Sequence, residues 1–306
     1  IEDSAFCVCG LTAITIPENV DSIGDFAFEN NKQLEKVVIK NKATYIGEAA
    51  FMNCAIESLT LDGTSTQEIG NDHAFANNKK LTSLKLEEGV TTIAYRSFID
   101  CENLEDIEFP KSLEKIGMSA FAGSKWLEKQ PEGPVYVNDI LLTWKGQTET
   151  AIIDEGTTYI EEAAFDNQKQ LKNVLIPSSV TTIRSYAFNN CYNLNRIVIP
   201  KTVTSIEKYA VGYHSEYGAK EKDLNLVIAG VKGSEAERYA NANGFEFEEI
   251  IPITGIEISQ TELSLEKGES QSLSVTIKPE NTTEDKTVTW SSDNAAVAKV
   301  DENGNV

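Results

Sequence analysis

The sequence predicts a repeat solenoid, with short parallel strands on one curved face, followed by a partial all-β sandwich. The first 249 of the 306 residues are self-similar at a spacing of about 23 residues, which is typical of a solenoid. Within each unit the apolar residues alternate as they do in a short, half-buried strand. After Pro252 the repeat stops and a two-residue alternation begins, which favours a sandwich. We therefore assign residues 1–249 to the solenoid and residues 250–306 to a second domain.

A column of phenylalanines marks the repeat most clearly. Successive members stand 22, 23, 24, 23, 23, 44 and 23 residues apart, so the longest step spans two repeats. Most of them follow an alanine, with an isoleucine five or six residues earlier and a leucine six residues later. The column consists of Phe6, Phe28, Phe51, Phe75, Phe98, Phe121, Phe165 and Phe188.

The segment Leu34-x-x-Val37-x-Ile39 shows how one unit folds. Its alternate apolar residues point inward from a short strand, and the Ile and Ala-Phe positions fill the rest of the coil. One coil cannot bury this face alone, so neighbouring coils stack and share a continuous core. The strands then align as a parallel sheet along one curved face.

The most complete units follow Ile-Gly-x-x-Ala-Phe-x-x-Cys-x-x-Leu-x-x-Ile-x-Ile-Pro, as in residues 183–200 apart from the glycine. This motif resembles the BspA-type leucine-rich repeats of bacterial surface proteins, and the resemblance covers about residues 1–249. Local departures are Ala94 in place of Gly, Val211 in place of the last Phe, and a unit one residue short at Cys54-Ala55-Ile56. The resemblance implies a leucine-rich-repeat solenoid displayed outside a bacterial cell.

Two segments interrupt or end the repeat. Near residues 128–151, two β-rich runs around Asn138-Asp139 predict a hairpin insertion of one repeat's length. At residues 224–249 we expect a helical and strand cap on the solenoid. Its helix begins at Ser234 as the N-cap, with Glu237 as the third helical residue, and ends before Gly244.

The second domain alternates apolar and polar residues, as in Ile256/Ile258 and Val288/Trp290, with turns near Gly268 and Pro279. Residues 253–306, including Val288-Thr-Trp290-Ser-Ser-Asp-Asn294, are similar to bacterial Ig-like domains of group 2. We expect about five strands, whereas a sandwich of this type needs roughly seven. The domain is therefore predicted to be incomplete, in a chain that continues beyond Val306.

Composition excludes some classes of partner. Lys plus Arg total 27 and Asp plus Glu total 48, so the formal net charge is −21. Such a charge repels nucleic-acid phosphates and anionic lipids.

No stretch is long and apolar enough to cross a bilayer, which takes about 20 residues. The start at Ile1 indicates a processed or excised piece. We expect an extracellular protein, bacterial cell-surface or secreted, in which regions outside this chain would provide any association with the cell wall.

Four of the five cysteines share one position in the repeat, three residues after the phenylalanine: Cys9, Cys54, Cys101 and Cys191. Residues at this position lie at least one coil apart, so the thiols cannot converge on a metal or a redox partner. We predict a column of buried thiols that act as small apolar residues. The role of Cys7, which lies outside this column, is left open.

No spacing in the sequence predicts catalysis. His73 and His214 stand alone on different coils, and His73 is expected at the coil surface. No nucleophile elbow, phosphate-binding loop or metal-ligand spacing occurs. We therefore expect no enzyme activity, no cofactor and no metal site, although acidic residues leave a weak calcium site open.

Two surfaces are candidates for binding. Side chains between the inward strand positions form two outward rows on the strand face. One row passes through Lys36, Asp106 and Arg196, and the other through Lys85, Glu108, Leu175 and Val198. A solvated sheet without a partner is an equal alternative. The second candidate is Trp126, Tyr136 and Trp144 around the insertion, since Trp and Tyr favour interfaces. Packing of these aromatics inside the fold is the favoured alternative.

The sequence thus predicts a non-enzymatic extracellular protein that binds a protein or glycan through its repeat surface. The alternative is a structural spacer or carbohydrate-binding region of a larger wall-associated protein, which an exposed cluster of Trp126, Tyr136 and Trp144 would favour. An enzyme would require a pocket that joins His73 or His214 to two carboxylates.

Overall fold

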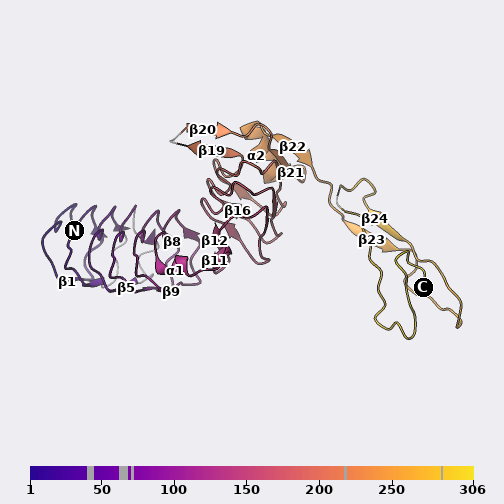
Figure 1. Cartoon of the computed structure of the whole chain (residues 1–306), viewed down its shortest axis with the longest axis horizontal. Coiled ribbons are helices and arrows are strands. Elements are labelled where there is room, and N and C mark those ends of the chain that lie inside the picture. The colour runs from indigo at the N-terminus through magenta and orange to yellow at the C-terminus, as the bar shows by residue number, and fades with distance from the viewer. Residues whose placement is uncertain (40–44, 62–67, 70–71, 217–218, 284) are drawn as a thin grey trace.

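The computed structural model describes the chain except residues 40–44, 62–67, 70–71, 217–218 and 284. The repeats wind into a solenoid whose axis changes direction near the middle, so that it divides into two stacks of coils (Figure 1). We call residues 1–128 the N-terminal stack and residues 129–249 the C-terminal stack. The two β-strands of the second domain follow at the C-terminal end of the chain.

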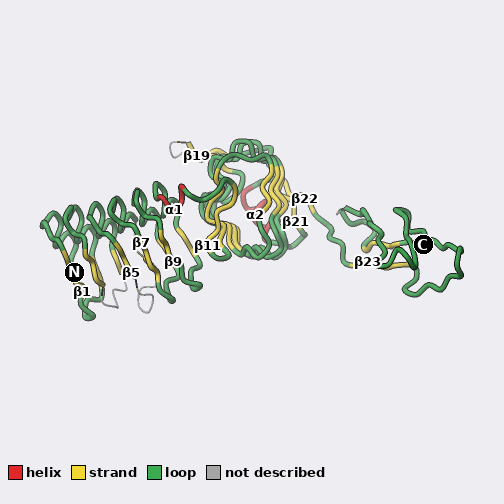
Figure 2. The backbone as a smooth tube through the Cα atoms, turned by 60° about the horizontal axis from the view of Figure 1, so that its bottom comes forward, coloured by secondary structure: helices red, strands yellow, loops and turns green. Residues whose placement is uncertain are grey.

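The N-terminal stack carries two parallel ladders of strands, which run along its length (Figure 2). The longer strands are β1 Ala13–Ile16, β3 Lys36–Ile39, β5 Ser58–Leu61, β7 Ser83–Leu86 and β9 Asp106–Glu108. The two-residue strands are β2 Ser22–Ile23, β4 Tyr45–Ile46, β6 Glu68–Ile69, β8 Thr92–Ile93 and β10 Lys115–Ile116. A single turn of helix, α1 Lys125–Glu128, ends the stack.

The C-terminal stack repeats the same two ladders after a hairpin. The hairpin consists of β11 Gly133–Val137 and β12 Ile140–Lys145, and β12 continues into the ladder of short strands. That ladder contains β14 Tyr159–Ile160, β16 Thr182–Ile183 and β18 Ser205–Ile206. The longer strands are β13 Thr150–Ile152, β15 Asn173–Leu175, β17 Arg196–Val198, β21 Val227–Gly230 and β22 Glu246–Glu249.

The hairpin also divides the apolar core. Val137 and Ile140 belong to the core of the N-terminal stack, whereas Leu141 belongs to the core of the C-terminal stack. The phenylalanine column runs through both cores as stacked rings, with centroids 4.8–5.7 Å apart, but is interrupted between Phe121 and Phe165. Stacked rings of this spacing stabilise the core beyond their burial alone. The repeat Phe residues from 28 to 188 are all buried, as the spacing predicts.

The turn that contains each phenylalanine requires two residues with a left-handed backbone. In the coil around Phe98 they are Arg96, with φ of 51°, and Asp100, with φ of 56°. Asn, Asp or Gly fills the second place in every coil from Asn30 to Asn190, because these residues tolerate positive φ best. The recurrent Asn two residues after the phenylalanine is therefore a backbone requirement.

The residue after each short strand distinguishes the two stacks. In the N-terminal stack it is glycine at 24, 47 and 117, where a side chain would collide with the backbone of the preceding coil at 2.4–2.9 Å. In the C-terminal stack the same place holds Glu161, Arg184 and Glu207. The N-terminal stack has Ala94 as one exception, so among its described coils this position holds at most a methyl group, whereas the C-terminal stack has room for long side chains there.

A helix and two strands close the C-terminal end of the solenoid. The helix α2 Glu235–Asn243 begins after Ser234 and ends at Gly244, which has a left-handed φ of 65°. The Ser234 side chain makes no capping hydrogen bond, whereas the Glu237 carboxylate accepts one from the Gly233 N–H at 2.6 Å. A second hairpin, β19 Tyr213–Glu216 and β20 Ala219–Lys222, was not expected from the sequence.

The second domain contains fewer strands than the expected five. Among the described residues it has β23 Gly255–Ile258 paired antiparallel with β24 Val275–Lys278, and one bridge between Ser272 and Asn305. The segments around Leu263 and Trp290 form no strand. Ile256, at 66 % exposure, shows the reason: no second sheet covers the apolar face of this pair in the described part of the domain. Without such a sheet, the apolar alternation cannot direct further strands to a core.

Candidate binding surfaces

The strand face of the C-terminal stack carries an exposed apolar row. Ile152, Leu175 and Val198 are 62 %, 53 % and 36 % exposed. Ile152 lies beside Leu175 in the β13–β15 pair, and Val198 occupies the same register on the next strand. Exposed apolar side chains that form a contiguous row, and are not scattered singly, are typical of an interaction surface.

A polar row flanks these side chains. It contains Thr150, Asn173 and Arg196, which precede the apolar residues by two positions and share their face. Arg196 donates two hydrogen bonds to Glu248 on β22, at 2.9 Å from Nε and 2.8 Å from Nη2. This pair raises the pKa of Arg196 and lowers the pKa of Glu248, mainly through these hydrogen bonds. Arg196 therefore links the cap strand β22 to β17, and it also belongs to the candidate surface.

A groove of about 500 Å³ adjoins the row on its C-terminal side. Its walls include Arg196, Val198, Pro200 and Glu248 from the solenoid, and Pro252 from the connection to the second domain. An apolar floor beside a charged pair suits a partner with both apolar and polar groups.

The strand face of the N-terminal stack is more polar. Lys36, Lys85, Asp106 and Glu108 are all exposed on it, in the two outward rows that the sequence predicts. Lys85 lies 3.3 Å from the carboxylate of Glu87, and both side chains are about half exposed. Such exposed pairs contribute little to stability, on the order of 0–1 kcal/mol. Little free energy is therefore needed to separate the two charges when a partner contacts them. Their role in binding stays a prediction.

The three aromatic residues of the second predicted surface, Trp126 on α1 and Tyr136 and Trp144 on the hairpin, pack against two separate cores. Trp126 packs edge-on against Phe109 and Phe121 at the end of the N-terminal column, with centroids 5.4 Å apart in both contacts. Trp144 stacks on Phe165 at 5.4 Å and so takes the place of the missing repeat phenylalanine. Tyr136 packs against the C-terminal core, and its hydroxyl accepts a hydrogen bond from the Asp154 N–H at 2.9 Å. These three side chains form no shared exposed patch.

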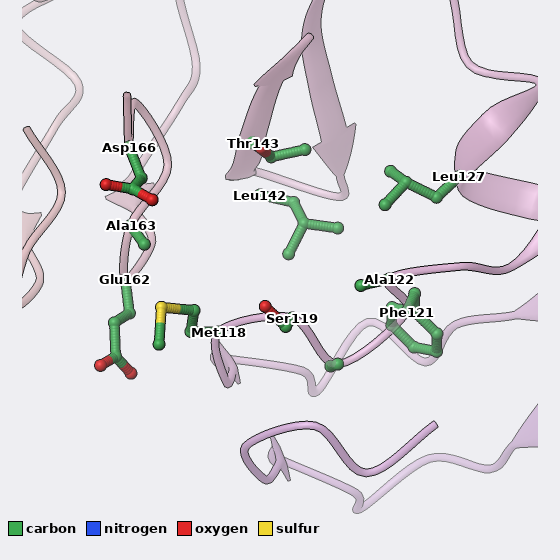
Figure 3. A pocket seen from close by; sticks show the side chains of 11 residues that line it. Met118, Ser119, Phe121, Ala122, Leu127, Leu142, Thr143, Glu162, Ala163 and Asp166 are labelled. Carbon is green, nitrogen blue, oxygen red and sulfur yellow. The ribbon is translucent and has the colours of Figure 1, made fainter. Parts of the chain in front are cut away.

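A pocket of about 260 Å³ lies where the two stacks meet (Figure 3). We call it the interstack pocket. The turn 118–122 of the N-terminal stack forms one wall and the turn 162–166 of the C-terminal stack forms the other. Leu127 and Leu142 point into the space between them, and the carboxylates of Glu162 and Asp166 lie along its edge (Figure 3).

An ion ladder lies beside this pocket. The Arg184 Nε donates to Glu161 at 2.6 Å and its Nη1 lies 3.2 Å from Glu207, so three successive coils are linked. Arg184 Nη2 also donates to the backbone oxygen of Glu114 at 2.8 Å, which links the two stacks. This ladder was not predicted from the sequence, although the 23-residue spacing of Glu161, Arg184 and Glu207 indicates it.

Glu161 is fully buried within the ladder. Burial raises the pKa of Glu161 to about 7, although Arg184 and nearby backbone N–H groups act in the opposite direction. Burial also raises the pKa of Glu162, which is nearer the pocket, and Lys115 opposes that effect. The junction between the stacks thus holds two carboxyl groups that are harder to ionise than exposed ones.

Three of the predicted column cysteines are buried, and Cys9 is not. The thiols of Cys54, Cys101 and Cys191 each donate to the backbone oxygen of a phenylalanine one coil earlier, at 3.2–3.4 Å. Burial raises the pKa of each to about 12. Cys9 is exposed because no earlier coil of this chain covers it, which corrects the prediction for that residue.

The two histidines do not converge. His73 has a left-handed backbone and lies edge-on to Tyr95 at 6.0 Å. His214 stacks on Tyr192 at 4.2 Å, with its Nε2 at 3.7 Å from Asp223. In the described ranges, no cluster of three or more His, Cys, Asp or Glu residues could hold a metal ion. Among the same residues, no helix is long and apolar enough to cross a membrane.

The model of the BspA type leucine rich repeat region matches residues 1–128 and 138–217, in six copies. The chain belongs to this family. The leucine-rich repeats therefore include most of both stacks, and the gap in the match, residues 129–137, contains β11 but not β12. The model of the bacterial Ig-like domain (group 2) matches residues 252–306. Neither family is a catalytic one, and no curated protein is similar enough to the chain to count as a relative.

Several solved leucine-rich-repeat proteins are similar to the chain. One from Eubacterium ventriosum is 27 % identical, with 67 % of this chain and 53 % of that chain covered and a TM-score of 0.39. A leucine rich cell surface protein from Faecalibacterium prausnitzii is 24 % identical, with 71 % and 63 % covered and a TM-score of 0.28. One from Bacteroides ovatus is 20 % identical, with 82 % and 88 % covered and a TM-score of 0.30. The match thus spans about half the length of the first of these proteins.

Proposed function

We propose that this chain is the recognition part of a bacterial cell-surface or secreted protein, and that it binds an extracellular protein through the strand face of the C-terminal stack. The observation that carries the proposal is the contiguous exposed row of Ile152, Leu175 and Val198. An apolar centre with a polar rim is the usual composition of a protein interface. The family and its accompanying Ig-like module support the extracellular setting.

A protein partner fits this surface better than a glycan. Sugar-binding sites commonly present aromatic rings to the flat faces of the sugar, whereas Trp126 and Trp144 pack on phenylalanines of the two cores. The net charge of −21 favours a partner with a basic or neutral contact surface over an acidic one. A spacer role, in which the repeats only separate other parts of a longer protein, is the alternative.

The test is a binding screen with matched variants. The whole chain is immobilised and tested against arrays of extracellular-matrix proteins and of glycans. Leu175→Asp places a charge in the middle of the apolar row, whereas Thr60→Asp makes the same change at the equivalent exposed position of the N-terminal stack. We expect saturable binding of a protein that Leu175→Asp weakens by at least tenfold, which corresponds to about 1.4 kcal/mol, and that Thr60→Asp leaves unchanged.

Other outcomes separate the alternatives. Binding that tolerates Leu175→Asp would move the site away from the C-terminal strand face. Binding of glycans alone would favour the carbohydrate interpretation. If the intact chain binds neither class, the spacer role becomes the better explanation.

A further inference from the structure

The interstack pocket coincides with a break in a backbone ladder. On the turn side of the solenoid, alternate N–H groups of each coil donate to carbonyl groups of the next coil. In the coil around Phe98, the donors are Arg96, Phe98 and Asp100, at 3.1, 2.9 and 2.8 Å from their acceptors. The acceptors belong to Met118, Ala120 and Ala122. This ladder joins successive coils on the side opposite the longer strands.

The ladder stops at the next coil. The equivalent donors there are the N–H groups of Ser119, Phe121 and Gly123, and no residue of the described chain accepts a hydrogen bond from them. Phe121 is only 2 % exposed, and it lines the interstack pocket. A buried N–H without an acceptor costs about 1–3 kcal/mol and is rare in folded proteins. The three donors therefore form an unfilled edge, and two of them, Ser119 and Phe121, belong to residues that line the pocket.

The opposite wall is also incompletely paired. In the C-terminal stack the acceptors at this level are the carbonyl groups of Glu162, Ala164 and Asp166. The hairpin supplies one donor, the Trp144 N–H, which lies 2.8 Å from the Ala164 oxygen. Within the described residues, the carbonyl groups of Glu162 and Asp166 accept nothing. The pocket thus occupies the place where a complete coil would have inserted its backbone.

We propose that the interstack pocket binds an extended peptide segment that carries a small aliphatic side chain next to lysine or arginine. Carbonyl groups of such a segment accept hydrogen bonds from the alternate N–H groups of Ser119 and Phe121, as the next coil does elsewhere. The aliphatic side chain contacts Met118, Leu127 and Leu142.

The charges around the pocket determine the flanking residues. The carboxylates of Glu162 and Asp166 lie along its edge. Lys115 lies near Glu162. Within the described residues, the Asp166 carboxylate accepts hydrogen bonds only from the neutral amides of Asn167 and Asn189, so the edge keeps a negative charge that favours a cationic side chain beside the aliphatic one. The same carboxylates disfavour an inorganic anion, which unpaired N–H groups alone would attract. They also disfavour a second copy of this chain, because both copies carry a net charge of −21.

The experiment uses the whole chain and two defined peptides. Acetyl-Lys-Ala-Leu-Ala-Lys-amide is the probe, and the peptide with both lysines replaced by glutamates is its control. Titration is followed by calorimetry and by tryptophan fluorescence, since Trp126 packs on Phe121 beside the pocket. We expect saturable binding of the lysine peptide and at least tenfold weaker binding of the glutamate peptide.

Two variants of the chain localise the site. Ala163→Tyr fills the pocket, and the fold tolerates tyrosine there because Tyr186 and Tyr209 occupy the equivalent left-handed position with φ of 58° and 63°. We expect it to weaken binding by at least tenfold. Glu162→Gln removes one carboxylate, with an expected loss of about fivefold, which is the usual size of one partly screened charge pair. Glu18→Gln, an equal change of charge on an exposed residue elsewhere in the repeats, is the matched control.

The proposal is overturned if the lysine peptide does not bind at millimolar concentration, or if Ala163→Tyr with an unchanged circular dichroism spectrum binds it as the original chain does. Equal losses in Glu162→Gln and Glu18→Gln would also overturn it, because they would indicate general electrostatic attraction. Leu175→Asp should leave peptide binding unchanged, so this test and the test of the strand face can fail independently.

Discussion

The two stacks use the same repeat but differ in the side chains that it leaves free. In the N-terminal stack the described residue after the short strand is glycine or, once, alanine, and the strand face is mostly polar, with Val38 as an exposed apolar side chain. In the C-terminal stack the same positions hold the Glu161–Arg184–Glu207 ladder and the apolar row of Ile152, Leu175 and Val198. The buried phenylalanine column is common to both. The fold therefore depends on the inward positions, and the other positions are available for function.

If both stacks depend on the phenylalanine column, removing one of its rings should lower the free energy of unfolding by a similar amount in either stack. Phe98→Ala and Phe188→Ala each remove a buried ring that stacks on a neighbouring ring. We expect each to lower the free energy of unfolding by about 3–5 kcal/mol, because a cavity remains where the ring was. Chemical denaturation followed by circular dichroism measures the change. A loss below about 1 kcal/mol for either variant would contradict its assignment to the column.

Loss of Arg184 should affect only the C-terminal stack and its junction. Arg184→Ala leaves Glu161 fully buried without its nearest cation, and it removes the hydrogen bond to the Glu114 oxygen. We expect a loss of about 3 kcal/mol at pH 8, since an uncompensated buried charge is costly. The double variant Glu161→Gln/Arg184→Ala should lose clearly less. An equal loss in the single and double variants would mean that the Glu161 charge is not the cause.

The sequence predicts the inward positions well because they recur. Each buried Phe, Ile and Leu appears again after about 23 residues, so the column, the parallel strands and the solenoid follow from spacing alone. The exposure of Cys9 was missed because the motif does not indicate which coil lacks a covering neighbour. The β19–β20 hairpin was missed because it lies outside the repeat and occurs once.

The candidate surfaces are harder to predict from the sequence for a physical reason. The apolar row depends on Ile152, whose place follows from the pairing of β13 with β15 after the hairpin. The row of outward residues in the sequence contained Leu175 and Val198 but not Ile152, because the hairpin interrupts the period there. The interstack pocket depends on which backbone groups lack a hydrogen-bond partner. Every residue except proline has an N–H group, so the sequence does not show which of these groups are unpaired.

The pH dependence of stability sharpens the comparison further. Burial raises the pKa of Glu161 to about 7 in the folded chain, against an ordinary value of 4.5. The folded state therefore holds this proton more tightly than the unfolded state does, and the stabilisation is complete below about pH 4.5 and lost as the pH rises through 7. Relative to Glu161→Gln, the original chain should lose about 2 kcal/mol between pH 5 and pH 8.

The measurement is a set of denaturation curves for both proteins at several pH values, and the quantity that matters is their difference. Other carboxyl groups titrate equally in the two proteins and cancel. The N-terminal stack has glycine or alanine at the equivalent described positions, so a pH effect of this size should be confined to the C-terminal stack. A difference that stays constant from pH 5 to pH 8 would mean that Arg184 keeps Glu161 ionised throughout, and that its burial inside the ladder is compensated by the ion pair.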